Sequence, residues 1–171
     1  MSVTPTIAAM EAQASLDPPA RVARLETRFG EIDGAMRGLP IHNPALAIKA
    51  VDFRPFASDA WIGVLLTPWF MNVIILPEAP TEVALAEIGT KVTIDLPAGK
   101  TVFVVGGDNL IGRYLMHSLI SPVLGFANQA QAEAEARRRF AAVMNPPAEK
   151  PLSREETSRQ YDRRALLFGR G

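Results

Sequence analysis

The side chains best suited to bind a metal ion or transfer a proton are two histidines, His42 and His117, and one aspartate, Asp108. A metal site needs three or four such ligands at close spacing, as in the HExxH pattern on a helix. The two histidines stand in different segments, and no HExxH pattern is present. A metal-dependent or hydrolytic accessory enzyme that uses His42 and His117 with Asp108 stays an alternative. The simpler interpretation is one loop histidine and one core or surface histidine, and we assign no metal ion, cofactor or catalytic residue.

Nucleophilic chemistry has little support in the sequence. The chain contains no cysteine, which excludes a thiol nucleophile, a disulfide and a thiolate metal site. Ser118 and Ser121 do not stand in a GxSxG elbow and have no recognisable base beside them. The pair Gly106 and Gly107 lacks the further glycine and the lysine of phosphate-binding loops, so it indicates a turn.

The apolar centre of the chain is residues 61–77, with the sequence WIGVLLTPWFMNVIILP. Two runs of strand-favouring residues are joined through Thr67 and Pro68, and Pro77 ends the second run. A helix through Pro68 would lose about 3 kcal/mol, because the ring removes a donor and clashes with the preceding turn. A membrane span needs ~20 apolar residues, whereas Thr67, Pro68 and Asn72 interrupt this segment. We therefore expect two strands with a sharp join in a soluble core, and no direct membrane insertion.

Trp61, Trp69, Phe70 and Met71 bring together both tryptophans of the chain and a methionine. Neighbours in a strand point to opposite faces, so Trp69 and Met71 are expected on one face and Phe70 and Asn72 on the other. One face must then contact something other than the inner core, either a helix of the same chain or a partner. Aromatic rings dominate binding hot spots and methionine adapts to different shapes, which suits an apolar peptide.

Helical and strand patterns on either side of this centre predict the elements that position it. An apolar stripe preceded by Asp17 and Pro18 predicts a first helix that ends at Gly38 and Pro40. An alanine-rich segment predicts a last helix at 126–144. The expected strands are residues 45–53, 61–66, 69–76, 91–96, 100–105 and 111–120, with a short helix as the alternative for the last. The order predicts an α+β fold: a two-layer sandwich, with an antiparallel sheet flanked by N-terminal and C-terminal helices.

Length and charge predict one domain without a nucleic-acid surface. A chain of 171 residues suffices for a single core, which is expected at 17–145, after a loose lead-in at 1–16 and before a flexible tail at 146–171. Lysine and arginine number 18, as do aspartate and glutamate, so nucleic acid and anionic membranes are not expected as partners. The N-terminus lacks the pattern of a secretory signal, and a cytoplasmic location is expected.

Four segments resemble the [NiFe]-hydrogenase assembly chaperones of the HybE/HupJ family. They are GLPIHNPAL at 38–46, GVLLTPWFMNVIILP at 63–77, KVTIDLPAGKTVFVVG at 91–106 and GRYLMHSLISPV at 112–123. The TPWFMN core is a run of uncommon residues in an uncommon order. The other segments follow the family's order along the chain, and the resemblance covers about residues 20–145.

The resemblance implies a non-enzymatic, cytoplasmic maturation factor for a membrane-bound uptake hydrogenase, with a fold similar to that of type III secretion chaperones. The implied partner is the iron-sulfur small subunit or its twin-arginine signal peptide, held back from export until the cofactors are in place. The large subunit and a second copy of the chain, as a homodimer, are further candidates. An oligomeric structural module, whose Trp69 face is a dimer interface, is the remaining alternative. We expect an apolar client segment to contact a site formed by Pro68, Trp69, Phe70, Met71, Asn72 and Tyr114.

Overall fold

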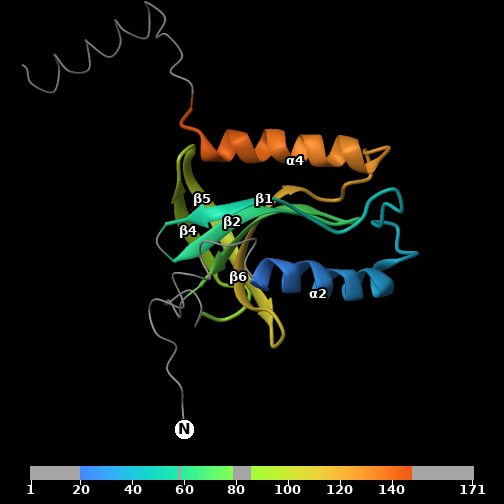
Figure 1. Ribbon diagram of the computed structural model, residues 1–171, viewed down its shortest axis with the longest axis horizontal. Coiled ribbons are helices and arrows are strands. Elements are labelled where there is room, and N and C mark those ends of the chain that lie inside the picture. The colour runs from blue at the N-terminus through green and yellow to red at the C-terminus, as the bar shows by residue number, and fades with distance from the viewer. Residues whose placement is uncertain (1–19, 58, 79–85, 148–171) are drawn as a thin grey trace, which may run out of the picture.

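The computed structural model describes residues 20–57, 59–78 and 86–147, and this part of the chain folds into two helices and one sheet (Figure 1). The elements in chain order are α2 (Ala20–Met36), β1 (Lys49–Phe56), β2 (Ala60–Leu66), β3 (Met71–Pro77), β4 (Lys91–Leu96), β5 (Gly99–Asp108), β6 (Gly112–Ile120) and α4 (Gln129–Met144). The expected lead-in, the capping residues Asp17 and Pro18 and the tail from residue 148 onward lie outside the described residues.

The six described strands form one antiparallel sheet with the order β1-β2-β3-β6-β5-β4. The segment at 111–120 supplies β6, which lies between β3 and β5, so the strand interpretation of this segment is confirmed. Tyr114 and Leu115 are 8% and 2% exposed and belong to the clusters on opposite faces of the sheet. Such two-sided burial is what a central strand requires.

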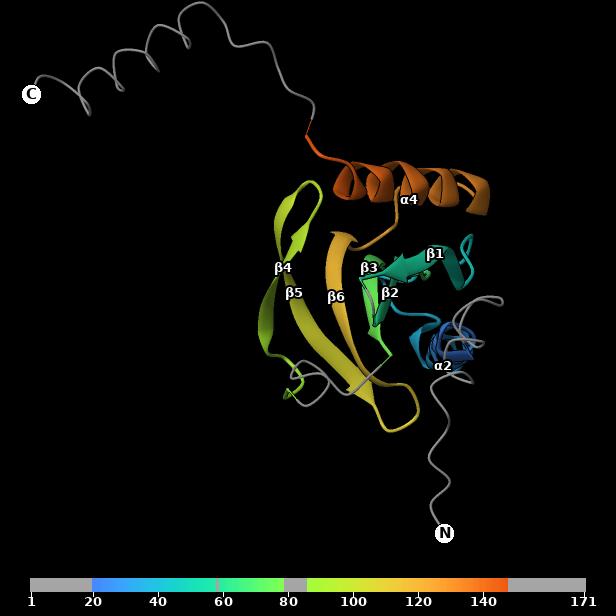
Figure 2. The same ribbon diagram turned by 60° about the vertical axis from the view of Figure 1, so that its left-hand side comes forward.

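The two helices lie on opposite faces of the sheet (Figures 1 and 2). The cluster under α4 includes Phe140 and Val73, whereas the cluster under α2 includes Leu25 and Ile74. Val73 and Ile74 are adjacent in β3, and both are fully buried. The α+β class and the antiparallel sheet flanked by N-terminal and C-terminal helices are confirmed. Because the central strands are apolar on both sides, the sheet has a helix on each face rather than one helical layer.

Each helix buries an apolar stripe, and α4 also has a side-chain cap. Leu25 and Phe29 of α2 are buried, as their spacing predicts. Helix α4 begins at Gln129, later than the expected residue 126, because Asn128 is its N-cap and accepts a backbone N–H of the first turn at 2.9 Å. Among the described residues, neither helix has the length and hydropathy of a membrane span.

Strand β1 begins at Lys49 and not at the expected residue 45. The side-chain oxygen of Asn43 accepts the Ala45 N–H at 3.0 Å, which makes a local turn. The Ala47 N–H donates to the side chain of Gln129 at 2.9 Å. These bonds use backbone donors that a strand would need, so the ladder with β2 starts only where Lys49 pairs with Leu66.

Gly106 and Gly107 lie inside β5 and not in the expected turn, which follows at residues 109–111. Gly106 pairs with Tyr114 of β6, and a Cβ atom on Gly106 would lie 2.8 Å from the Tyr114 ring. Gly107 has a φ of 142°, which residues with a side chain rarely adopt. Gly106 thus leaves room for the Tyr114 ring, whereas Gly107 allows the close approach of the Gly112 backbone.

Candidate functional site

The β2–β3 turn at residues 67–70 is organised by Thr67, which is fully buried. Its Oγ1 atom accepts hydrogen bonds from the Trp69 and Phe70 N–H groups at 3.3 and 2.9 Å. The Pro68 carbonyl accepts the Asn43 N–H at 2.7 Å. The turn is therefore held both by its own hydroxyl and by the loop that follows α2, and it keeps Trp69 outside strand β3.

Trp69, Phe70 and Tyr114 form an aromatic cluster with Phe29 of α2. The Phe29 ring centroid lies 6.4 Å from that of Trp69, 5.6 Å from Phe70 and 6.5 Å from Tyr114. Trp69 and Phe70 meet edge to face at 5.8 Å, a favourable arrangement for aromatic pairs. The aromatic cluster consequently anchors α2 to the β2–β3 turn and to β6.

Of the six residues predicted to bind a client, only Phe70 is partly exposed. Trp69 is 8% exposed and Met71 is fully buried. The other three, Pro68, Asn72 and Tyr114, are also buried. The structure brings Trp69, Phe70 and Tyr114 together but places them beneath α2. Of the two groups expected to contact this face, a helix of the same chain or a partner, it is the helix that covers it.

The expectation that Trp69 and Met71 share a face is wrong. Met71 opens β3 and belongs to the cluster under α4, whereas Trp69 belongs to the cluster under α2. The alternation of side chains applies only within a strand, and β3 begins after Phe70. Trp69 stands in the turn, whose geometry Thr67 sets.

Within the described part of the chain, neither helix covers the α2 side of β5, because α2 lies beside β1 to β3 and away from β4 and β5 (Figure 2). Val102 and Val104 point to this side, since Phe103 between them packs in the cluster under α4. Val102 is 50% exposed, and Val104 is half-buried beside its β6 partner Met116. We name this area the open face, which consists of Phe70, Val102, Val104 and Met116.

Asn72 contributes an unusual buried polar atom on the same side of the sheet. It pairs with Ser118 of β6, two residues along β3 from Ile74 of the cluster under α2. Its side chain is 6% exposed, and its Oδ1 atom accepts no hydrogen bond from the described residues. A buried amide oxygen without a donor costs about 1–3 kcal/mol.

His42 interacts with Asp33, a partner that the sequence analysis missed. Its Nε2 atom lies 2.8 Å from Asp33 Oδ1, and Arg37 Nε donates to Asp33 Oδ2 at 3.0 Å. Burial alone would raise the pKa of Asp33, but the hydrogen bonds from His42 and Arg37 outweigh it and lower this pKa. Arg37 directly follows α2, and its i, i+4 spacing from Asp33 is the only signal in the sequence that marks the aspartate.

Asp108 and His117 have other partners. Asp108 accepts Arg28 Nε at 2.7 Å and the Ile111 N–H at 2.9 Å, and both bonds, led by the one from Arg28, lower its pKa. His117 Nδ1 lies 2.9 Å from the Val102 carbonyl, which fixes the ring on β6. His42, Asp108 and His117 thus serve three separate contacts. The described residues contain no group of three acidic, histidine or cysteine side chains that could hold a metal ion.

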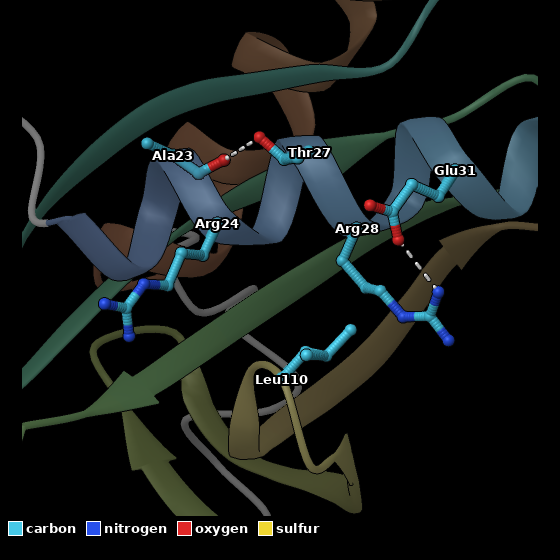
Figure 3. Close-up of a pocket in the computed structure, with 6 residues that line it drawn as sticks. All are labelled: Ala23, Arg24, Thr27, Arg28, Glu31 and Leu110. Atoms are coloured by element: carbon cyan, nitrogen blue, oxygen red, sulfur yellow. Dashed lines mark hydrogen bonds and ion pairs between the residues drawn. The ribbon is translucent and has the colours of Figure 1, made fainter.

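Arginines tie the outer side of α2 to the β5–β6 turn. Arg28 joins Asp108 and also Glu31, at 3.0 Å, and Arg21 donates to the Arg113 carbonyl at 2.9 Å. A shallow pocket lies between the helix and the turn, with the side chains of Arg24 and Arg28 beside Leu110 (Figure 3). Because Arg28 and Glu31 are already paired, this pocket is a weaker candidate for a binding site than the open face.

The described residues form an α+β fold that combines a buried aromatic cluster with a sheet face that neither helix fully covers. Residues 20–169 match the family model described as [NiFe]-hydrogenase assembly, chaperone, HybE. The chain belongs to this family, and it is a hydrogenase assembly chaperone.

Relatives and a solved structure agree with this assignment. The chain is 40% identical over 137 residues to the hydrogenase expression/formation protein HupJ of Bradyrhizobium diazoefficiens, with 79% of each chain covered. It is 35% identical over 142 residues to the protein HupT of Azotobacter chroococcum mcd 1, also a hydrogenase expression/formation protein, with 83% of this chain and 93% of the relative covered. The solution structure of HybE from Escherichia coli superposes with a TM-score of 0.57 at 26% identity, over 88% of this chain and 90% of the other.

Proposed function

We propose that this chain binds, in the cytoplasm, the small iron-sulfur subunit of a [NiFe] uptake hydrogenase, or the twin-arginine signal peptide of that subunit, before export. It acts by binding and not by catalysis. Membership in the hydrogenase assembly family supports a hydrogenase subunit as the partner. The resemblance of the TPWFMN segment to HybE/HupJ chaperones favours the small subunit, and a signal peptide offers the apolar segment that a chaperone shields.

The open face is the observation on which the site of binding rests. Val102 lies in the middle of β5, yet half of its surface is exposed. Contiguous exposed apolar surface on a soluble protein marks an interaction site. In our proposal, the apolar segment lies across Phe70, Val102 and Met116.

The buried members of the predicted site support this surface from behind. Trp69 meets Phe70 edge to face, and Tyr114 fills the space between α2 and β5. The Pro68 carbonyl anchors the turn to the loop after α2, and Met71 pairs with Leu66 directly beside the turn. Their role in client binding is therefore to hold Phe70 in place, while the contact itself is made by the open face.

Isothermal titration calorimetry with a synthetic signal peptide of the hydrogenase small subunit tests the proposal. The double variant Val102→Thr, Met116→Gln keeps the side-chain volumes but makes the open face polar, and we expect the affinity to fall at least tenfold. Leu110→Gln is the matched control, because Leu110 is 63% exposed at the β5–β6 turn. Equal affinity of the double variant and the wild type would refute the open face as the contact, and the absence of binding by the wild type would refute the signal peptide as the client.

A further inference from the structure

The two edges of the sheet differ in how well they resist pairing with another strand. The ladder of β1 is interrupted by a shift between Val51 and Arg54, and Asp52 and Ala57 both have a φ of 53°. A proline, Pro55, also lies in this strand. Bulges, prolines and irregular backbone are the features that protect an edge strand. Strand β4 has none of them: its residues pair with β5 without a break, from Lys91 opposite Val104 to Leu96 opposite Gly99.

The hydrogen bonds just before β4 show which of its backbone groups face outward. Val105 N–H donates to the Thr90 carbonyl at 2.9 Å, and Gly89 N–H donates to the Val105 carbonyl at 2.8 Å. Antiparallel ladders alternate between hydrogen-bonded and non-hydrogen-bonded pairs. Residues 92, 94 and 96 therefore bond to β5, whereas the N–H and C=O groups of Lys91, Thr93 and Asp95 point away from it. Among the strands that the structure describes, β4 is the outermost on its side of the sheet (Figure 2).

We propose that β4 pairs with the β4 strand of a second copy of this chain, antiparallel and centred on Thr93. In this register, Lys91 of each copy lies opposite Asp95 of the other, and Val92 lies opposite Ile94. The outward N–H and C=O groups of Lys91, Thr93 and Asp95 then bond to those of the second copy. Directly opposed charges of opposite sign stabilise a pair of strands.

Neighbouring registers lack this complementarity. A pair centred on Ile94 would place Lys91 opposite Pro97, which has no N–H to donate. A pair centred on Val92 would place Asp95 opposite Gly89 and leave both charges without a counterion. Asp95 already contacts Lys100 of its own chain at 3.0 Å, but both side chains are more than three-quarters exposed, so this contact leaves the carboxylate accessible to a second lysine.

The dimer joins the binding surfaces of the two copies. Its two-fold axis runs perpendicular to the sheet, so the same face of both sheets points the same way. The open faces then lie on one side of a continuous sheet, on either side of the β4 pair. This consequence rests on the proposed function, whereas the pairing itself does not. One strand pair of six residues is smaller than a standard interface, so we expect a reversible dimer with a Kd in the micromolar range, on the order of 10 μM.

Charge reversal tests the register. Sedimentation velocity of the full chain, over a concentration series, measures the Kd of the dimer. In the Lys91→Glu variant, the new carboxylate lies opposite Asp95 of the other copy, and this like-charge pair occurs twice in the dimer. In the Asp95→Lys variant, the new ammonium group lies opposite Lys91 of the other copy, also twice. Each variant should therefore raise the Kd of the dimer at least tenfold. The double variant Lys91→Glu, Asp95→Lys restores opposite charges at both positions, and its Kd should return to within about threefold of the wild type. Lys49→Glu, the same reversal on the β1 edge, is the control and should leave the Kd unchanged.

A backbone variant gives a second measurement that does not depend on charge. Thr93→Pro removes an N–H that faces the open edge and not one that bonds to β5, so the fold should persist, as checked by circular dichroism, while the dimer is lost. A wild-type chain that stays monomeric at about 200 μM, well above the expected Kd, or a dimer that tolerates Lys91→Glu and Thr93→Pro, would overturn the proposal. Peptide calorimetry with the monomeric variants reports separately on client binding, so a failure of the dimer and a failure of the proposed function are distinguishable.

Discussion

His42 Nε2 lies 2.8 Å from Asp33 Oδ1, and this pair ties the loop after α2 back to the helix that covers Trp69. The side chains of His42 and Asp33 are 8% and 13% exposed. Asp33→Ala removes the acceptor of both His42 and Arg37, so we expect the free energy of unfolding to fall by about 1–3 kcal/mol. Urea denaturation measures the change. Glu31→Ala, which removes an exposed ion pair from the same helix, should cost less than about 0.5 kcal/mol, and an equal loss in both variants would contradict the structural role of the pair.

Trp69→Ala should lower stability more than any change on the open face. The ring is 8% exposed and contacts Phe29, Phe70 and His42. Truncation of a buried aromatic side chain leaves a cavity and typically costs about 3–5 kcal/mol. The fluorescence of Trp61 remains as a probe in urea denaturation. Phe70→Ala, at a partly exposed position, is the comparison and should cost less, and the reverse order would show that Trp69 is not held in the core.

Gly106→Ala should destabilise the chain by about 1–3 kcal/mol, because the new Cβ atom would lie 2.8 Å from the Tyr114 ring. Tyr114 cannot move without disturbing Phe29, 6.5 Å from it between ring centroids. Thermal unfolding measures the effect. Gly125→Ala adds a methyl group where no atom lies within 4 Å, so its melting temperature should be unchanged or slightly raised.

Acid should destabilise the chain through carboxyl groups whose pKa is lowered in the folded state. Hydrogen bonds from Arg138 and Arg139 lower the pKa of Glu135 to about 2. The pKa of Asp108 is lowered chiefly by Arg28, and that of Asp33 is lowered by His42 and Arg37 against the opposing effect of burial. A lowered carboxyl pKa contributes stability above the ordinary value near 4, and this contribution is lost as the pH falls through the folded value.

The urea midpoint should therefore stay level from about pH 7 to 5 and fall between about pH 4.5 and 2. Glu135→Gln should flatten part of this fall, because it removes one of the groups that bind a proton on unfolding. Glu133→Gln, on the same helix, serves as the control and should keep the wild-type profile. A midpoint that rises toward pH 2 would contradict the direction of the three pKa shifts.

Local patterns were sufficient for most elements. The stripe that contains Leu25 and Phe29 predicted α2, and the strand patterns at 91–96 and 100–105 predicted β4 and β5. Two apolar runs around Pro68 predicted the β2–β3 pair. Each of these elements could be predicted because its cause is local. Side-chain periodicity and proline geometry act between residues that are close in the sequence.

The candidate site depended on contacts between distant segments. A run of TPWFMN does not reveal whether Trp69 belongs to a strand or to a turn, and the Thr67 hydroxyl and the Asn43 N–H decide this. Nor does periodicity reveal which face a helix will cover when both sides of a strand are apolar, as in β3.

The amino-acid sequence was sufficient to assign the family, the α+β class and the apolar centre around Pro68. Three features depend on packing between distant segments: α2 covers Trp69, β6 lies between β3 and β5, and Val102 is exposed. The physical reason is that burial is a property of pairs of surfaces. A residue's own chemistry sets the cost of exposure, but the element packed against it decides whether that cost is incurred.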